Sequence, residues 1–213
     1  MKAGSLAIFF SALAASVSAQ SCNADTPAPV LAQSATSTST STSTSTSAAV
    51  KPTQTSAAVP GGASGQASTT RYSDGQMGAC GCGDSSGTMF SWQTGISPTF
   101  FTAAGSSPIF GSGTWCGSGC GKCYQLTNTG QTPTGGDPGP DGAVVNVMVT
   151  NLCPAQGNEQ WCSTPNQYGM DAHFDIMGGV PGWDNPIVTY EEIPCPGSGN
   201  SLFSQCRCAS GGS

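Results

Sequence analysis

Charged side chains are scarce in this 213-residue chain, which has five lysines and arginines, eleven aspartates and glutamates and a net charge of −6. With so few cations the chain has no basic patch, so nucleic acids and anionic membrane surfaces are poor partners. Low charge combined with many glycine, serine, threonine and asparagine residues suits a surface that faces a neutral, hydroxyl-rich ligand.

Long hydrophobic runs are also nearly absent, and the one exception lies at the start of the sequence. An apolar run from Leu6 to Val17 follows a positively charged Lys2, and the small residues up to Ala19 suit cleavage. The run is too short to span a bilayer, so it predicts a signal peptide over residues 1–19. We expect a mature chain that begins near Gln20, is secreted and has no membrane partner.

Cysteine is abundant, with eleven residues of which ten fall between Cys80 and Cys208. In an oxidising compartment, an even set within one domain predicts about five disulfides. Zinc is the rival interpretation because two groups have ligand-like spacing: Cys116, Cys120 and Cys123, and Cys206 with Cys208. A single histidine and a secreted location favour disulfides. Cys22 stands apart from the others, and we expect it to be free or to pair with another chain.

Composition divides the chain into four parts. After the signal peptide comes a short segment, residues 20–33, and then a stretch of Ser, Thr, Ala, Gly, Pro and Gln over residues 34–69. Such a stretch has no apolar face to bury and is typical of a disordered linker. Residues 70–213 are then predicted to form a single folded domain of common size.

The domain shows β-strand patterns and no convincing long amphipathic helix. Residues 143–150 are rich in β-branched side chains, and residues 122–127, 172–177 and 187–193 alternate in polarity. Turn-forming residues separate these stretches. The fold class is therefore predicted to be all-β, as a small closed barrel with long disulfide-linked loops.

Two carboxylates are the main candidates for chemistry. In residues 172–177, alternation directs Phe174 and Ile176 to one face, and the only histidine, His173, to the other face with Asp175. That face could be a catalytic surface or simply a solvated surface. Alternatively, His173 and Asp175 could form a hydrogen bond that only braces the sheet. Asp74 precedes a glycine, a common turn sequence, so a structural role is equally open for it.

Aromatic residues in polar loops indicate a binding cleft. Tyr72, Trp115 and Trp161 are the candidates for stacking on sugar rings, although loop aromatics can also cover a small core.

Five ordered blocks carry a resemblance to a known family: RYSDGQMGACGCG (71–83), WCGSGCGKCY (115–124), VTNLCP (149–154), GNEQWC (157–162) and NQYGMDAHFDIM (166–177). Together they resemble fungal endoglucanases of glycoside hydrolase family 45, across essentially all of residues 70–210. A His-Phe-Asp motif alone would be weak evidence for this family, because expansins share the motif.

The resemblance implies a six-stranded double-psi β-barrel with an open groove, and inverting hydrolysis of internal β-1,4-glucosidic bonds without metal or cofactor. It makes Asp175 the general acid and Asp74 the general base. The family motif around the base is Arg-Tyr-Trp-Asp-Cys-Cys, and the sequence departs from it at Ser73, Gly75 and Gln76.

Another branch of the family uses an asparagine as the base, with a second asparagine completing a proton relay. The matching residues here are Asn158 and Asn166, so the choice between Asp74 and Asn158 stays open, with Asp74 favoured because a carboxylate is the better base. The substrate-binding candidates are Tyr72, Trp115, Trp161 and His173, and we expect the histidine to be neutral or to face away from the acid.

The expected partner is a β-1,4-glucan, either cellulose or a mixed-linkage glucan, bound by a monomeric protein. The leading alternative is a non-hydrolytic, expansin-like protein that binds glucan on the same barrel. A cysteine-rich defence protein of the barwin kind would share the barrel but would not need the Asp74 and Asp175 pair.

Overall fold

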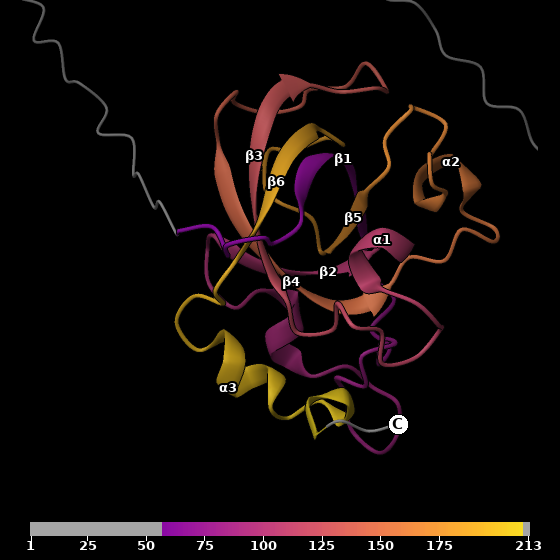
Figure 1. Ribbon diagram of the computed structural model, residues 1–213, viewed down its shortest axis with the longest axis vertical. Helices are drawn as coiled ribbons and strands as arrows, with labels where there is room; N and C mark the ends of the chain where they lie inside the picture. The colour runs from indigo at the N-terminus through magenta and orange to yellow at the C-terminus, as the bar shows by residue number, and fades with distance from the viewer. Residues whose placement is uncertain (1–56, 211–213) are drawn as a thin grey trace, which may run out of the picture. The chain divides into compact units, whose positions relative to one another are not determined.

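Six strands form a closed barrel in the computed structural model, which describes residues 57–210 (Figure 1). The order around the barrel is β1-β5-β2-β4-β3-β6. The β1–β5 and β2–β4 pairs are parallel and the other four are antiparallel. The strands are β1 (Ser64–Tyr72), β2 (Phe100–Gly105), β3 (Cys123–Gln131), β4 (Val144–Leu152), β5 (His173–Met177) and β6 (Ile187–Ile193).

The helices are short and lie between the strands or after them. They are η1 (Ser91–Thr94), α1 (Ser107–Phe110), α2 (Glu159–Cys162), α3 (Gly199–Phe203) and η2 (Arg207–Ser210). Within residues 57–210, no helix has the length and apolar character needed to cross a membrane. The predicted all-β barrel of six strands is confirmed.

The first strand begins six residues before the predicted domain boundary at residue 70. β1 begins at Ser64, and even Val59 donates its backbone N–H to the Glu192 carbonyl at 2.8 Å. Residues 64–69 are small and polar, so their composition matches that of a linker. They are nevertheless ordered because β6 pairs with residues 64–68 and β5 pairs with the strand from Ser68 onward. The predicted signal peptide, Cys22 and the linker up to residue 56 lie outside the described residues.

Inward-facing side chains of all six strands fill the barrel. Leu126 and Phe174 are fully buried in the main cluster, and the Tyr124 ring packs 5.3 Å from the Phe174 ring. Because side chains alternate along a strand, the residues on either side of Phe174 must lie on the outer surface of the barrel. Those residues are His173 and Asp175.

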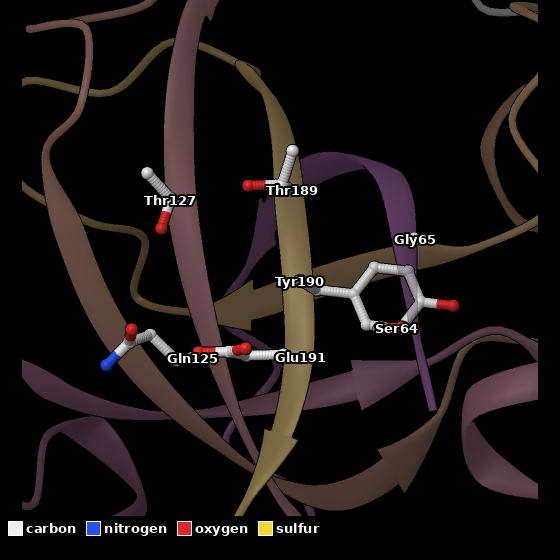
Figure 2. A pocket seen from close by; sticks show the side chains of 7 residues that line it. All are labelled: Ser64, Gly65, Gln125, Thr127, Thr189, Tyr190 and Glu191. Carbon is white, nitrogen blue, oxygen red and sulfur yellow. The ribbon is translucent and has the colours of Figure 1, made fainter. Parts of the chain in front are cut away.

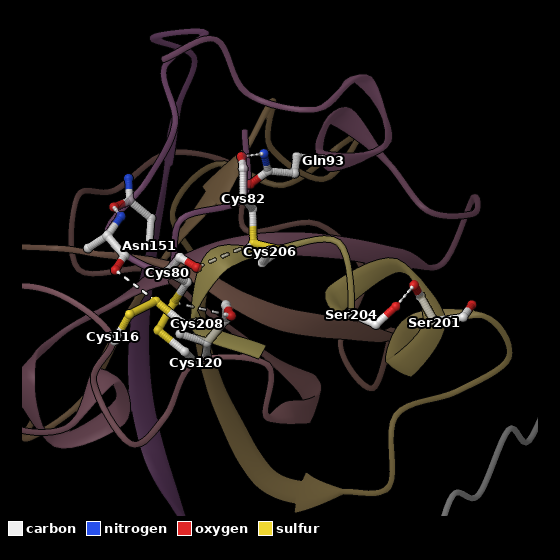
Figure 3. Close-up of a disulfide and its surroundings, with 12 residues drawn as sticks. Cys80, Cys82, Gln93, Cys116, Cys120, Asn151, Ser201, Ser204, Cys206 and Cys208 are labelled. Atoms are coloured by element: carbon white, nitrogen blue, oxygen red, sulfur yellow. Dashed lines mark hydrogen bonds between the residues drawn. A yellow bond between two sulfur atoms is a disulfide. The ribbon is translucent and has the colours of Figure 1, made fainter. Parts of the chain in front are cut away.

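Five disulfides join the ten cysteines between 80 and 208, as predicted: Cys80–Cys120, Cys82–Cys206, Cys116–Cys208, Cys123–Cys195 and Cys153–Cys162. Three of them attach the loops and the C-terminal segment beneath the barrel (Figure 3). Four close segments of 40 to 124 residues, and on the chain-entropy account each contributes about 4–5 kcal/mol.

Candidate active site

The candidate site lies on the outer face of the parallel β1–β5 pair. In the register of these strands Ser68 lies opposite His173 and Thr70 lies opposite Asp175. Parallel pairing of two alternating strands therefore gathers two hydroxyls, one imidazole and one carboxyl on one surface, although about a hundred residues separate the strands in sequence.

A chain of four hydrogen bonds connects these groups. The Asn166 amide nitrogen Nδ2 donates to Ser68 Oγ at 2.7 Å, and Ser68 Oγ lies 2.8 Å from His173 Nδ1. On the other side of the ring, His173 Nε2 lies 2.9 Å from Thr70 Oγ1. The Thr70 hydroxyl donates to Asp175 Oδ1 at 2.7 Å.

Only one set of proton positions satisfies every bond when Asp175 is ionised and His173 is neutral. Thr70 gives its single hydroxyl proton to Asp175, so it must accept the proton of His173 Nε2. The histidine is then the Nε2–H tautomer, and its Nδ1 accepts the Ser68 hydroxyl proton. Every donor in the chain therefore points toward the carboxyl group.

His173 is completely buried, and burial lowers its pKa from 6.5 to about 3. The Trp161 ring lies 5.7 Å from the imidazole and helps to cover it. The ring is thus neutral at ordinary pH, as expected from the sequence. Its burial argues against the substrate-binding role predicted for it, because both ring nitrogens already face the Ser68 and Thr70 hydroxyls.

The Asp175 carboxyl is partly exposed and has a raised pKa. Burial is the largest cause, since it disfavours the charged form, and the negative charge of Asp74 adds to it. The hydrogen bond from Thr70 acts in the opposite direction and lowers the pKa. Asp175 therefore combines access to solvent with a tendency to keep its proton, as a general acid requires.

Asp74 is exposed and lies two residues beyond the end of β1. The backbone N–H of Gln76 donates to its Oδ1 at 3.0 Å, which holds the turn. Burial raises the pKa of Tyr72, and the charges of Asp74 and Asp175 raise it further. Both carboxyl groups are therefore close enough to the Tyr72 hydroxyl to act on it electrostatically.

The two asparagines differ in their surroundings. Asn166 is buried, and besides Ser68 its amide nitrogen donates to the Trp161 carbonyl at 3.0 Å. Asn158 is exposed at the start of α2, and its amide nitrogen donates to the Pro154 carbonyl at 3.2 Å. Its backbone carbonyl accepts the Trp161 N–H at 3.0 Å. Among the described contacts, the chain from Asp175 thus reaches residue 158 through the backbone of α2.

Two of the three predicted aromatic residues lie beside the network. Trp161 packs 4.6 Å from the Tyr168 ring, and both Trp161 and Tyr72 contact a small buried cluster that includes the Cys153–Cys162 disulfide. Trp115 is 46% exposed on a different loop. The contacts described for residues 57–210 do not connect it to Asp175.

One group of side chains has the spacing of metal ligands, because sulfur and nitrogen atoms of Cys153, Cys162 and His173 lie within 4.8 Å of one another. Both sulfurs are consumed by the disulfide, and both histidine nitrogens face hydroxyl groups. A disulfide sulfur has no thiolate to offer a metal, so this group does not form a metal site.

The sequence did not indicate Ser68 and Thr70, although they connect the histidine to the acid. Serine and threonine at these positions resemble the preceding polar stretch. Only the register between β1 and β5 shows that their hydroxyls face His173 and Asp175.

The sequence is similar to an expansin-related domain family and to known endoglucanases. A family model described as EXPB1-like domain 1 matches residues 67–201. The chain is 53% identical over 151 residues to Endoglucanase-5 of Hypocrea jecorina, covering 67% of this chain and 62% of that protein. It is 40% identical over 167 residues to an endoglucanase of Mytilus edulis, covering 67% of this chain and 90% of that one.

A solved endoglucanase structure is similar to this protein in both sequence and fold. The GH45 endoglucanase EG27II, determined in complex with cellobiose, is 44% identical with a TM-score of 0.60, covering 67% of this chain and 88% of that one. The fold is thus that of the expansin-related barrels. The chain belongs to the glycoside hydrolase family 45 endoglucanases.

Proposed function

We propose that this protein is a secreted endo-β-1,4-glucanase that cleaves internal bonds of β-1,4-glucan with inversion, and that Asp175 is its general acid. The observation that carries the proposal is a partly exposed carboxyl group with a raised pKa and one oxygen held by Thr70. The relatives support the reaction, and cellobiose bound to EG27II supports the class of ligand. Five disulfides favour an oxidising, extracellular compartment.

The Thr70 hydroxyl fixes the orientation of the acid. Because Asp175 Oδ1 accepts this hydrogen bond, the acidic proton belongs on Oδ2, which then faces the glycosidic oxygen. When that proton is transferred, the bond between the anomeric carbon and the leaving oxygen breaks. The carboxylate that remains is stabilised by a chain of donors that all point toward it.

Asp74 is our candidate for the general base. It is exposed at the end of β1, and its charge acts on Asp175. A water molecule between Asp74 and the anomeric carbon gives its proton to this carboxylate as the new carbon–oxygen bond forms. An inverting enzyme needs the two carboxyl groups about 6.5–9.5 Å apart to leave room for that water. After one turnover the protonation states of Asp74 and Asp175 have exchanged, and solvent resets them.

Aromatic rings would hold the glucan next to the acid. Trp161 and Tyr72 flank the hydrogen-bonded network, so either ring can stack on a sugar bound at Asp175. Trp115 has the exposure that stacking requires. It stays our candidate for binding a sugar unit of the glucan farther from Asp175. His173 acts through Thr70 and is a positioning residue.

The rival base is Asn158, whose exposed amide would have to act as an imidic acid. We compare Asp74→Asn with Asn158→Ala by counting reducing ends released from carboxymethyl cellulose. If Asp74 is the base, Asp74→Asn lowers turnover by about 10²–10⁴-fold, the usual contribution of a general base, while Asn158→Ala stays close to the unsubstituted enzyme. The reverse pattern would move the base to Asn158. Failure of the unsubstituted protein to release reducing ends would favour the non-hydrolytic, expansin-like function.

A further inference from the structure

A polar groove crosses the outer face of β1, β6 and β3, away from the candidate acid. Its lining includes Ser64, Gln125, Thr127, Thr189, Tyr190 and Glu191, and its volume is about 360 Å³ (Figure 2). A second hollow of about 350 Å³ shares Ser64 and Tyr190 with it and continues toward Asp171. We call the two together the β1–β6–β3 groove.

The strand register arranges the polar groups of the groove in two rows. Ser64, Glu191 and Gln125 lie opposite one another across three neighbouring strands. Gln66, Thr189 and Thr127 form the next row in the same way. Neighbouring strands are about 4.8 Å apart and alternate residues about 6.6 Å apart, so hydrogen-bonding groups recur at a spacing close to that of the hydroxyls on a sugar chain.

Tyr190 belongs to the lining of both hollows, but side-chain alternation along β6 turns its ring to the face opposite Thr189 and Glu191, toward the barrel core. Figure 2 shows these three residues side by side on β6. The Tyr190 ring lies against Gly65, where an added Cβ would meet the ring at 3.3 Å, so glycine leaves the room that the ring occupies. On its other sides it meets Tyr124 and Phe174 edge-on, with ring centroids 6.0 and 5.5 Å away. The ring therefore holds β1 and β6 together beneath the two polar rows.

The charges of the groove select the class of ligand. The charged side chains that line it are Glu191 and Asp171, both acidic, so an anionic ligand is disfavoured. Carboxylates, amides and hydroxyls are suited to a neutral polyol, because carboxylates accept hydrogen bonds from hydroxyl groups.

β1 connects the groove to the candidate acid. Its outward-facing residues run from Ser64 through Ser68 to Thr70, which is bonded to Asp175. Six residues of strand separate Ser64 from Thr70, a distance of about 20 Å. A chain of several sugar units bound in the groove would therefore lie within reach of the site that cleaves the same polymer.

We propose that the β1–β6–β3 groove is a second binding site for β-1,4-glucan, separate from the site at Asp175. This inference rests on the proposed function for the identity of the polymer. Holding one segment of an insoluble chain raises the effective concentration of its neighbouring segments at the acid.

The test is an NMR titration of the full chain carrying Asp175→Asn, which keeps cello-oligosaccharides intact, with cellohexaose as the probe. We expect two sets of backbone amides to shift, one around Thr70 and Trp161 and a second around Ser64, Gln66 and Thr189. Adding Thr189→Ala and Glu191→Ala should weaken binding at the second set about tenfold, through the loss of one or two hydrogen bonds, and leave the first set unchanged.

A matched control carries Asn200→Ala and Gln205→Ala, two exposed amides on or beside α3, outside the groove. It should titrate like the parent, and near-ultraviolet circular dichroism checks that each variant is folded. Shifts confined to the amides around Thr70 and Trp161 would overturn the second site and leave the proposed function intact. If neither set shifts, the second site is overturned as well. If, in addition, the unsubstituted protein releases no reducing ends, the proposed function fails too.

Discussion

Acid should destabilise this protein through His173, whose pKa falls from 6.5 to about 3 on folding. Between these two values the unfolded chain binds a proton that the folded chain does not. Stability from this group is therefore complete above pH 6.5 and is lost as the pH falls toward 3. Between about pH 6.5 and about pH 4 the loss is about 3 kcal/mol, since one proton changes stability by about 1.4 kcal/mol per pH unit.

The comparison that isolates this effect uses His173→Gln, which cannot titrate. Guanidinium unfolding with intact disulfides gives the free energy of unfolding of both proteins at several pH values. We expect the advantage of the unsubstituted protein to shrink by about 3 kcal/mol between about pH 6.5 and about pH 4. The Asp175 pKa is raised on folding, so its contribution has the opposite sign, and to first order it cancels because both proteins contain it. A difference that does not change with pH would contradict the buried, neutral ring.

Two further substitutions test the acid and the core. Thr70→Val removes the hydrogen bond that lowers the pKa of Asp175, so the alkaline limb of the kcat/KM profile should move to higher pH, and a move to lower pH would contradict the assignment. Phe174→Ala should cost about 3–5 kcal/mol in guanidinium unfolding because the ring is fully buried against Tyr124, whereas exposed Asn200→Ala should stay within about 0.5 kcal/mol.

Side-chain patterns predicted much of the barrel. The four stretches expected as strands correspond to β3, β4, β5 and β6, because each has enough apolar or β-branched side chains to show which face is buried. The same alternation predicted that His173 and Asp175 share a face opposite Phe174. Strand periodicity is a local property, so sequence alone can reveal it.

Long-range pairing explains what the sequence could not predict. β1 has small, polar residues, and its order depends on backbone bonds to strands more than a hundred residues away. The partners of the cysteines and the contacts of Ser68 and Thr70 have the same origin. The full burial of His173 also required the structure, since it depends on the loop that carries Trp161 and Asn166.

The most direct test of the central claim is turnover by Asp175→Asn on soluble β-1,4-glucan, with the thermal midpoint measured in parallel. An amide cannot protonate the leaving oxygen, so we expect the release of reducing ends to fall by about 10²–10⁴-fold or more while the midpoint barely changes. A variant that folds normally and keeps most of its activity would show that another group supplies the proton.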